Sequence, residues 1–154
     1  GDKNTKAVLE LLTSSGKVAI PAQTYLEKVV EGDRRVILIG GKPRGVINRR
    51  ARADDLRSNM HAGGVAEPAQ LDAHDLQICA AIGPELVRRG LPFVGIDVIG
   101  GLLTEINVTS PTGIQEINRF EGACIEAELI DWVEIRAAEL RQLTERTWQD
   151  GRGL

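Results

Sequence analysis

Residues 93–114, with the sequence FVGIDVIGGLLTEINVTSPTGI, constrain the fold of this 154-residue chain more than any other stretch. Two short runs rich in β-branched residues, 93–99 and 102–108, flank the pair Gly100-Gly101. This pattern predicts two antiparallel strands joined by a tight turn. We therefore take the hairpin as the element around which the rest of the chain is organised.

Three polar side chains interrupt the apolar runs of the hairpin: Asp97, Glu105 and Asn107. Residues two apart on a strand share a face, so Glu105 and Asn107 point the same way. Asp97 joins them only if it lies opposite Glu105 rather than opposite Thr104. That register predicts a three-residue loop, Gly100-Gly101-Leu102, because a two-residue turn would put Asp97 on the other face.

Two carboxylates and an amide oxygen at one point would form a hard, oxygen-rich cation site. Such ligands suit Mg²⁺, which takes a few protein oxygens and completes its octahedron with water and substrate phosphate. The stretch contains no Cys or His, which argues against zinc. The competing interpretation is that Asp97 and Glu105 lie on a solvated face, as charged residues usually do.

The segment after the hairpin favours the metal site. Residues 107–113, NVTSPTG, combine an amide, hydroxyls, Pro and Gly, and lead into a helix predicted to begin at Ile114. Backbone N–H groups and hydroxyls at the start of a helix form an anion site. A Mg²⁺ site beside an anion site indicates phosphate chemistry.

The hairpin and the loop after it resemble the metal and substrate segment of prokaryotic glutathione synthetase, a family of the ATP-grasp superfamily. An acidic residue followed by E-x-N is common among ATP-grasp ligases, whereas the extension VTSPTGIQEINRF is specific to this family. The resemblance runs from Val18 to Phe120. It implies an α+β fold, the C-terminal lobe of an ATP-grasp domain, with a largely antiparallel sheet packed with helices. It also implies that Asp97, Glu105 and Asn107 bind Mg²⁺, or Mn²⁺ in its place, and that Ser110 and Thr112 contact the substrate.

The resemblance extends to residues before the hairpin. Gln23, Tyr25 and Leu26 match the adenine-binding hinge of the family, and Asp33 matches the acceptor for the ribose hydroxyls of ATP. Arg35 matches a catalytic arginine that faces the terminal phosphate, and the planar fork of an arginine can hold a phosphate or carboxylate in two places. Without the resemblance, this segment would be interpreted as an ordinary strand and turn.

Residues 49–64 form the longest irregular stretch, and long loops in compact domains are usually lids or binding loops. Its four arginines could clamp a substrate with two free carboxylates, as γ-glutamylcysteine has. By resemblance, Arg49 and Arg57 match the family's substrate arginines, and Asn59 follows them as a substrate-binding residue. The dipeptide Arg50-Ala51 departs from the family pattern, which leaves open whether Arg49 or Arg50 faces the site. His61 is a candidate general base, although a loop histidine is more often solvated.

Length and composition predict one domain, residues 1–146, with a flexible tail at 147–154. The net charge of −3 gives no indication of nucleic-acid binding, and no apolar run is long enough to span a membrane. The two cysteines, Cys79 and Cys124, are too few for a disulfide framework and indicate a reducing cytoplasm. Both are predicted to be small core residues on apolar helix faces.

The remaining elements are predicted from turn signals and apolar spacing. Asp72 and Asp75 form a helix start, and Pro84 is expected to kink that helix or to open a second segment. Antiparallel strands that come before any long helix favour an α+β domain. The predicted strands are 18–26, 35–39 and 45–49, and the predicted helices are 2–15, 71–90, 114–120 and 123–145.

The resemblance also implies an activity: ATP-dependent joining of γ-glutamylcysteine to glycine through an acyl phosphate. Members of the family have a preceding domain, two lysines that reach the nucleotide phosphates and a glycine-rich loop, which do not lie upstream of Gly1 here. We therefore expect this chain to be the C-terminal part of such an enzyme, inactive when isolated, and to form a homo-oligomer. The alternatives are another ATP-grasp ligase for a different acid and amine, or a non-catalytic module for nucleotide binding or subunit assembly.

Overall fold

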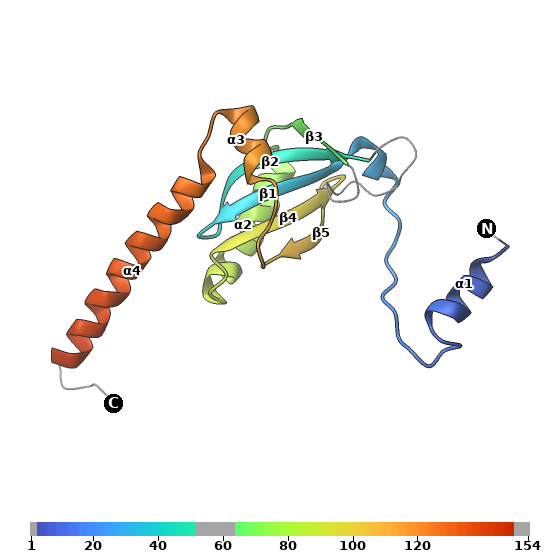
Figure 1. Cartoon of the computed structure of the whole chain (residues 1–154), viewed down its shortest axis with the longest axis horizontal. Coiled ribbons are helices and arrows are strands. Elements are labelled where there is room, and N and C mark those ends of the chain that lie inside the picture. Colours follow the sequence, from blue (N-terminus) through green and yellow to red (C-terminus); the bar gives the residue numbers. More distant parts are fainter. Residues whose placement is uncertain (1–2, 52–63, 150–154) are drawn as a thin grey trace.

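A five-stranded, wholly antiparallel sheet in the order β3-β2-β1-β4-β5 forms the centre of the molecule. The computed structural model describes residues 3–51 and 64–149. The strands are β1 (Asp33–Ile39), β2 (Lys42–Arg50), β3 (Val65–Pro68), β4 (Phe93–Ile99) and β5 (Leu102–Asn107). The helices are α1 (Thr5–Leu12), a 3₁₀ turn η1 (Glu27–Glu31), α2 (Ala73–Arg88), α3 (Ile114–Glu121) and α4 (Ile125–Gln149). The predicted α+β fold is confirmed (Figure 1).

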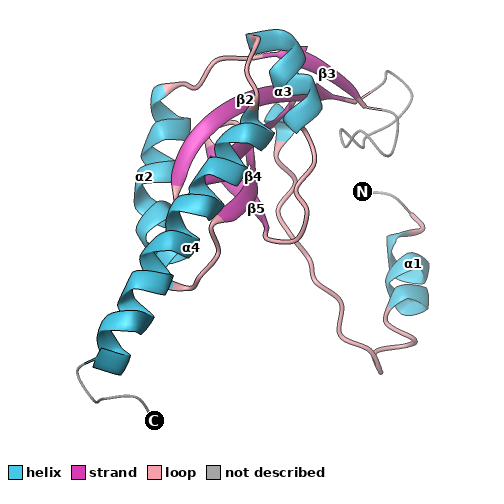
Figure 2. Ribbon diagram, turned by 60° about the vertical axis from the view of Figure 1, so that its left-hand side comes forward, coloured by secondary structure: helices cyan, strands magenta, loops and turns pink. Residues whose placement is uncertain are grey.

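Helices cover both faces of the sheet, so its central strands are apolar on both sides (Figure 2). On one face, α2 packs Cys79 and Leu86 against a cluster that includes Val36 and Ile96. On the other, Ile117 of α3 and Ile125 of α4 pack on the second cluster, formed by Ile37, Ile39 and Ile47. Consecutive residues of β1 are therefore buried, which explains why this strand lacks the alternation of a half-exposed strand.

The N-terminal part differs from the prediction. Residues 18–26, predicted as a strand, form an extended segment that pairs with no strand of the described sheet. Pro21 lies within this segment, and a proline cannot donate a ladder hydrogen bond. The segment leads from the short helix α1, none of whose residues is buried, to η1 at the end of the sheet where the central strand β1 begins (Figure 1). The edge strand β3, which has only four residues, was not predicted.

Helix α2 begins with the predicted capping box. The Asp72 carboxylate accepts from the backbone N–H groups of His74 and Asp75 at 2.8 and 2.9 Å, and the Asp75 carboxylate accepts from that of Asp72 at 3.1 Å. The helix continues through Pro84, which excludes a second segment, and the alternative of a kink at Pro84 stays a prediction. Proline removes one helical hydrogen bond, and the buried side chains of Cys79 and Leu86 hold both halves of the helix on the sheet.

The turn of the central hairpin also differs from the prediction. Ile99 pairs with Leu102, so the turn has two residues, Gly100 and Gly101, whose φ values of 59° and 79° fit a primed turn. The predicted three-residue loop is therefore wrong. A β-bulge at Thr104 then shifts the register, and Asp97 lies opposite Glu105 as predicted. The Thr104 hydroxyl, which donates to the Asp97 carbonyl oxygen at 3.0 Å, holds the bulge.

Helix α4 is longer than predicted and continues through Gln149, beyond the expected start of a tail at residue 147. Only its first turns pack on the sheet, through Ile125, Leu129 and Trp132. The rest projects from the body of the molecule (Figures 1 and 2). None of the helices in the described ranges is long and apolar enough to cross a membrane.

Gly83 of α2 and Gly41 of the β1–β2 turn bring two backbones into close contact. A Cβ at Gly83 would lie 2.3 Å from the Gly41 carbonyl oxygen, which cannot move without its strand. We therefore expect Gly83→Ala to lower the free energy of unfolding by about 3 kcal/mol through overpacking, measured by urea denaturation. Helix propensity alone would predict the opposite sign, a gain of about 1 kcal/mol. Ala81→Gly on the exposed face of α2 calibrates that propensity effect, and a stabilised Gly83→Ala variant would contradict the proposed contact.

The two cysteines lie in different environments. Cys79 is buried, and burial, together with the nearby charge of Asp75, raises the pKa of its thiol to about 11. Cys124 is exposed in the segment before α4, so its predicted place in the core is wrong. The short loop between α3, which ends at Gly122, and α4 carries this residue, rather than a helix face.

This difference predicts selective alkylation of the native chain. Iodoacetamide at pH 8 should modify Cys124 and modify Cys79 at least about 100-fold more slowly, because the reactive species is the accessible thiolate. Mass spectrometry of tryptic peptides measures both rates, and denaturation in urea should make them equal. Equal rates in the native chain would show that Cys79 is accessible.

Candidate active site

Four buried charged residues lie together on the sheet face that also carries α3. Arg35 of β1 pairs directly with Asp97 of β4, and Asp33 of β1 pairs directly with Arg49 of β2. Directly paired residues share a face, and so do residues two apart on one strand, so all four side chains point the same way. Their exposed fractions lie between 2% for Arg49 and 7% for Asp33. We call these four residues the charged cluster.

Asp97 is the centre of the charged cluster. Arg35 Nε donates to Asp97 Oδ1 at 2.5 Å and Arg35 Nη2 donates to Oδ2 at 3.0 Å, a bidentate pair. Arg49 Nη2 lies 2.9 Å from Asp97 Oδ1 and also binds the Asp33 carboxylate. Burial alone would raise the pKa of Asp97, but the hydrogen bonds and charges of Arg35 and Arg49 outweigh it and hold the pKa below its ordinary value.

Glu105 and Asn107 extend the charged cluster onto β5, at the outer edge of the sheet. Burial, the charge of Asp97 and a hydrogen bond with Asp97 raise the pKa of Glu105 above its ordinary value. The Asn107 amide is satisfied when its nitrogen donates to Glu105 Oε1 at 3.1 Å and its oxygen accepts from Arg35 Nη2 at 3.2 Å. In the opposite orientation the amide oxygen faces Glu105, and a cation between these two acceptors would satisfy both.

These residues fit a hard divalent cation. Within residues 3–51 and 64–149, no three His, Cys, Asp or Glu side chains are arranged to hold a metal, so a site here needs the Asn107 amide oxygen as third ligand. Two carboxylates and an amide oxygen are the ligand types that Mg²⁺ takes. Partial burial raises the pKa of Glu105 most, and the nearby charge of Asp97 raises it further; a cation would relieve that repulsion.

The loop after β5 is fixed to the charged cluster. Arg35 Nη1 donates to the Thr112 carbonyl oxygen at 3.1 Å, and Pro111 is buried against the sheet. Gly95 of β4 makes room for this contact, because a Cβ there would lie 2.6 Å from the Pro111 Cβ. Ser110, with a φ of 49°, and Thr112 are exposed, so the loop presents polar groups beside the cluster.

The other predicted site residues divide into three groups. Asp33, predicted to bind ribose, lies in the charged cluster, where it pairs with Arg49. The predicted adenine-binding residues, Gln23, Tyr25 and Leu26, lie on the extended segment before η1, and Tyr25 is 61% exposed. Arg57, Asn59 and His61 lie outside the described residues.

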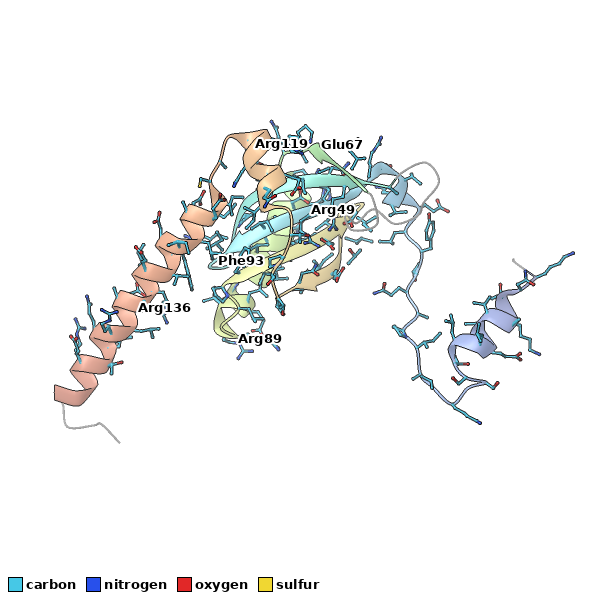
Figure 3. All side chains as sticks on the ribbon, in the orientation of Figure 1. Arg49, Glu67, Arg89, Phe93, Arg119 and Arg136 are labelled. Atoms are coloured by element: carbon cyan, nitrogen blue, oxygen red, sulfur yellow. The ribbon has the colours of Figure 1, made fainter. Side chains whose placement is uncertain are left out.

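The structure separates the two candidate arginines at the end of β2. Arg49 is buried in the charged cluster at the centre of the sheet (Figure 3). Arg50 points to the opposite face, where its Nε lies 3.6 Å from Glu67 of β3 and 3.5 Å from the Glu31 carbonyl oxygen. Arg49 is therefore the residue that can take part in the site.

The sequence predicts that Arg35 and Arg49 lie near phosphate or substrate, but it does not reveal that both bind Asp97. It also missed the roles of Gly95 and of the Thr112 backbone carbonyl. One signal was present in the sequence. Asp33 and Arg35 are two residues apart along β1, as Arg35 and Ile37 are, so the two charged side chains share a face. The pairing of β1 with β4, which brings Asp97 to Arg35, joins segments far apart in the chain.

The sequence of the chain matches a known protein family. The family described as prokaryotic glutathione synthetase, ATP-grasp domain, matches residues 1–122. The chain belongs to this family. The glutathione synthetases of Nostoc sp. and Brucella melitensis are 47% and 51% identical to it, over 134 and 136 residues. That of Prochlorococcus marinus is 50% identical over 125 residues.

The chain corresponds to only part of each relative. The alignments cover 87%, 88% and 81% of this chain, and 41%, 44% and 41% of the Nostoc, Brucella and Prochlorococcus proteins. The chain thus spans about two fifths of the length of the curated relatives it matches. A solved structure of D-alanine–D-alanine ligase from Bacillus anthracis complexed with ATP has a TM-score of 0.48 and 15% sequence identity to this chain. The overlap covers 93% of this chain and 49% of the ligase chain. That overlap is too weak to carry any conclusion.

The charged cluster predicts that Asp97 and Glu105 differ in their effect on stability. Asp97→Asn would leave two buried guanidinium groups with one remaining carboxylate, and we expect a loss of about 3 kcal/mol in the free energy of unfolding. Glu105→Gln, at an exposed position, should change it by less than about 0.5 kcal/mol. Urea denaturation of both variants measures the difference. A loss for Asp97→Asn as small as the loss for Glu105→Gln would show that Arg35 and Arg49 do not depend on Asp97.

Proposed function

We propose that this chain supplies part of the active site of a glutathione synthase, which joins γ-glutamylcysteine to glycine with ATP. One observation carries the proposal. Three oxygen ligands suited to Mg²⁺ lie beside two buried arginines on one sheet face, in a chain of the glutathione synthetase ATP-grasp family. Cationic and metal-binding groups side by side are what phosphoryl transfer requires, because its transition state carries charge on several oxygens.

In the proposed reaction, the cysteinyl carboxylate of γ-glutamylcysteine attacks the γ-phosphorus of ATP and ADP leaves. The glycine amine then attacks the acyl carbon of the resulting acyl phosphate, and inorganic phosphate leaves as the amide forms. Arg35 would stabilise the transferring phosphoryl group, and Arg49 and Arg57 would orient the carboxylates of the peptide. The remaining assignments are Gln23, Tyr25 and Leu26 to adenine, Asp33 to ribose, and Asn59, Ser110 and Thr112 to the substrate.

Asp97, Glu105 and Asn107 would hold Mg²⁺, or Mn²⁺ in its place. The bound ion would neutralise charge on the phosphates of ATP. Arg35 is held by Asp97 on one side and by the Thr112 carbonyl on the other, so its guanidinium needs little reorganisation when an anion arrives. That rigidity supports a role in stabilising charge rather than in moving protons.

We further propose a cytoplasmic location and a homo-oligomer. Neither cysteine forms a disulfide, which supports a reducing compartment where ATP and a thiol substrate occur together. The family and the composition give no reason to expect nucleic acid or membrane as a partner.

A chimera tests the proposed function, since the chain spans about two fifths of its relatives. The aligned segment of the Nostoc synthetase is replaced by the matching residues of this chain, and ADP release is measured with γ-glutamylcysteine, glycine and Mg·ATP. We expect turnover, and a fall in kcat of at least about 100-fold for Glu105→Gln in the chimera, because a charge-stabilising ligand is lost. Mn²⁺ binding, followed by electron paramagnetic resonance in the presence of ATP, should weaken in parallel.

Glu10→Gln on exposed α1 is the matched control and should change neither kcat nor Mn²⁺ binding. A folded chimera whose turnover is insensitive to Glu105→Gln would contradict the assignment of that residue. ADP release with other acids and amines, but not with γ-glutamylcysteine and glycine, would identify another ATP-grasp ligase. A folded chimera that binds ATP without any turnover would favour the non-catalytic module.

A further inference from the structure

Along the stretch where the two strands of the hairpin pair, β5 has one residue more than β4. Leu103 lies opposite Val98. The next pair is Glu105 with Asp97, so Thr104 has no partner of its own on β4. Without this extra residue, Leu103 and Glu105 would share a face, because residues two apart on a strand point the same way. With it, Leu103 packs against the apolar cluster that α2 covers, whereas Glu105 faces the charged cluster.

The turn of the hairpin is fixed independently of the bulge. A Cβ at Gly100 would lie 2.6 Å from Cδ of Lys28. A Cβ at Gly101 would lie 3.5 Å from the His74 ring. Side chains of η1 and α2 therefore lie against the two turn residues. Leu103, packed on the apolar cluster, holds the first residues of β5 in the same register. A change at the bulge is thus expected to leave the turn in place and to affect only the residues after it.

Continued without a bulge, the register of this turn would not assemble the proposed cation site. It would place Glu105 opposite Ile96 and not opposite Asp97. Asn107 would lie opposite Val94. Both of these partners are fully buried in the apolar cluster, so the two oxygen ligands would point away from the charged cluster. The three ligands therefore share a face only in the bulged register.

One side-chain hydrogen bond spans the bulge. The Thr104 hydroxyl donates to the Asp97 carbonyl oxygen at 3.0 Å, in a half-buried position. The carboxylate of the same aspartate is held by Arg35 and Arg49. Asp97 is thus bound to β5 through its backbone and to β1 and β2 through its side chain. The hydroxyl ties the extra residue of β5 to the residue at the centre of the charged cluster.

We propose that Thr104 is a positioning residue for the cation site. Its hydroxyl stabilises the bulged register, the one in which Glu105 and Asn107 lie on the face of Asp97. The presence of a cation at this face rests on the proposed function, whereas the effect of the hydroxyl on the register does not.

Thr104→Val tests the effect on the register, because valine keeps the branched shape and removes the donor. Hydrogen exchange of the 154-residue chain, followed by nuclear magnetic resonance, measures how often β5 opens. We expect the protected amide protons of residues 105–107 to exchange about three- to tenfold faster, as the loss of one hydrogen bond implies. Those of β1 should stay within about twofold. Thr104→Ser keeps the hydroxyl and should restore the original rates, and Thr104→Ala should behave as Thr104→Val.

Cation binding tests the effect on the site. In the chimera with the Nostoc synthetase, Thr104→Val should raise the Kd of Mn²⁺ in the presence of ATP about tenfold, as the loss of a group that orients a metal ligand typically does. The Mg²⁺ concentration at half-maximal ADP release should rise in parallel, while the KM for γ-glutamylcysteine stays within about twofold. Thr144→Val is the matched control. Its hydroxyl donates to the Leu140 carbonyl oxygen at 2.9 Å on α4, and its loss should change none of these values.

Unchanged exchange of residues 105–107 in Thr104→Val would overturn the proposal, because the hydroxyl would then not hold the register. Faster exchange with an unchanged Kd for Mn²⁺ would also overturn it, since the register would then not position the ligands. A Thr104→Ser variant no better than Thr104→Val would assign the effect to side-chain shape and exclude the hydroxyl. A chimera that binds Mn²⁺ without turnover would contradict the proposed function, and hydrogen exchange and Mn²⁺ binding would still decide the role of Thr104.

Discussion

The ion pairs of Asp97 are the interaction on which the rest of the structure depends. Through Arg35 and Arg49 this one carboxylate joins β4 to β1 and β2, and through Arg35 it reaches the loop that ends at α3. Buried charges are tolerated only when they are balanced and hydrogen-bonded. The two arginines, Asp33 and Asp97 sum to zero, so the charged cluster can stay dry. Glu105 adds one negative charge at its exposed rim, where a divalent cation would be attracted.

The geometry of this rim is set by backbone features rather than by long side chains. The bulge at Thr104 turns Glu105 onto the face of Asp97, and Gly95 lets Pro111 lie against the sheet. Removing either feature would separate the acidic residues from the loop without changing any charge. The hairpin that organises the fold is therefore the same element that assembles the site. This is why a short stretch of sequence carried so much of the functional prediction.

Sequence patterns predicted the features that depend on residues close together in the chain. The capping box of Asp72 and Asp75, the two hairpin strands and the shared face of Glu105 and Asn107 follow from spacing and turn chemistry. Asp97 joins that face only because of the bulge at Thr104. The bulge was not predictable, because one extra residue in β5 leaves no mark on an apolar run. Neither was the contact of Arg35 with Asp97, since it needs the order of strands in the sheet. Residues 18–26 have strand-like composition, but they pair with no strand of the described sheet, and all except the half-buried Ile20 and Leu26 are exposed.

The same sheet separates the two surfaces that this chain presents. Asp33 begins β1 inside the charged cluster, and Ile39 ends it beside Gly40, where Trp132 of α4 packs. Six residues of extended strand span about 20 Å, so the end of the sheet on which Trp132 packs lies far from Asp33. The central strands that hold the charged cluster are packed on both faces, so the cluster keeps its geometry independently of the part of α4 that projects from the sheet.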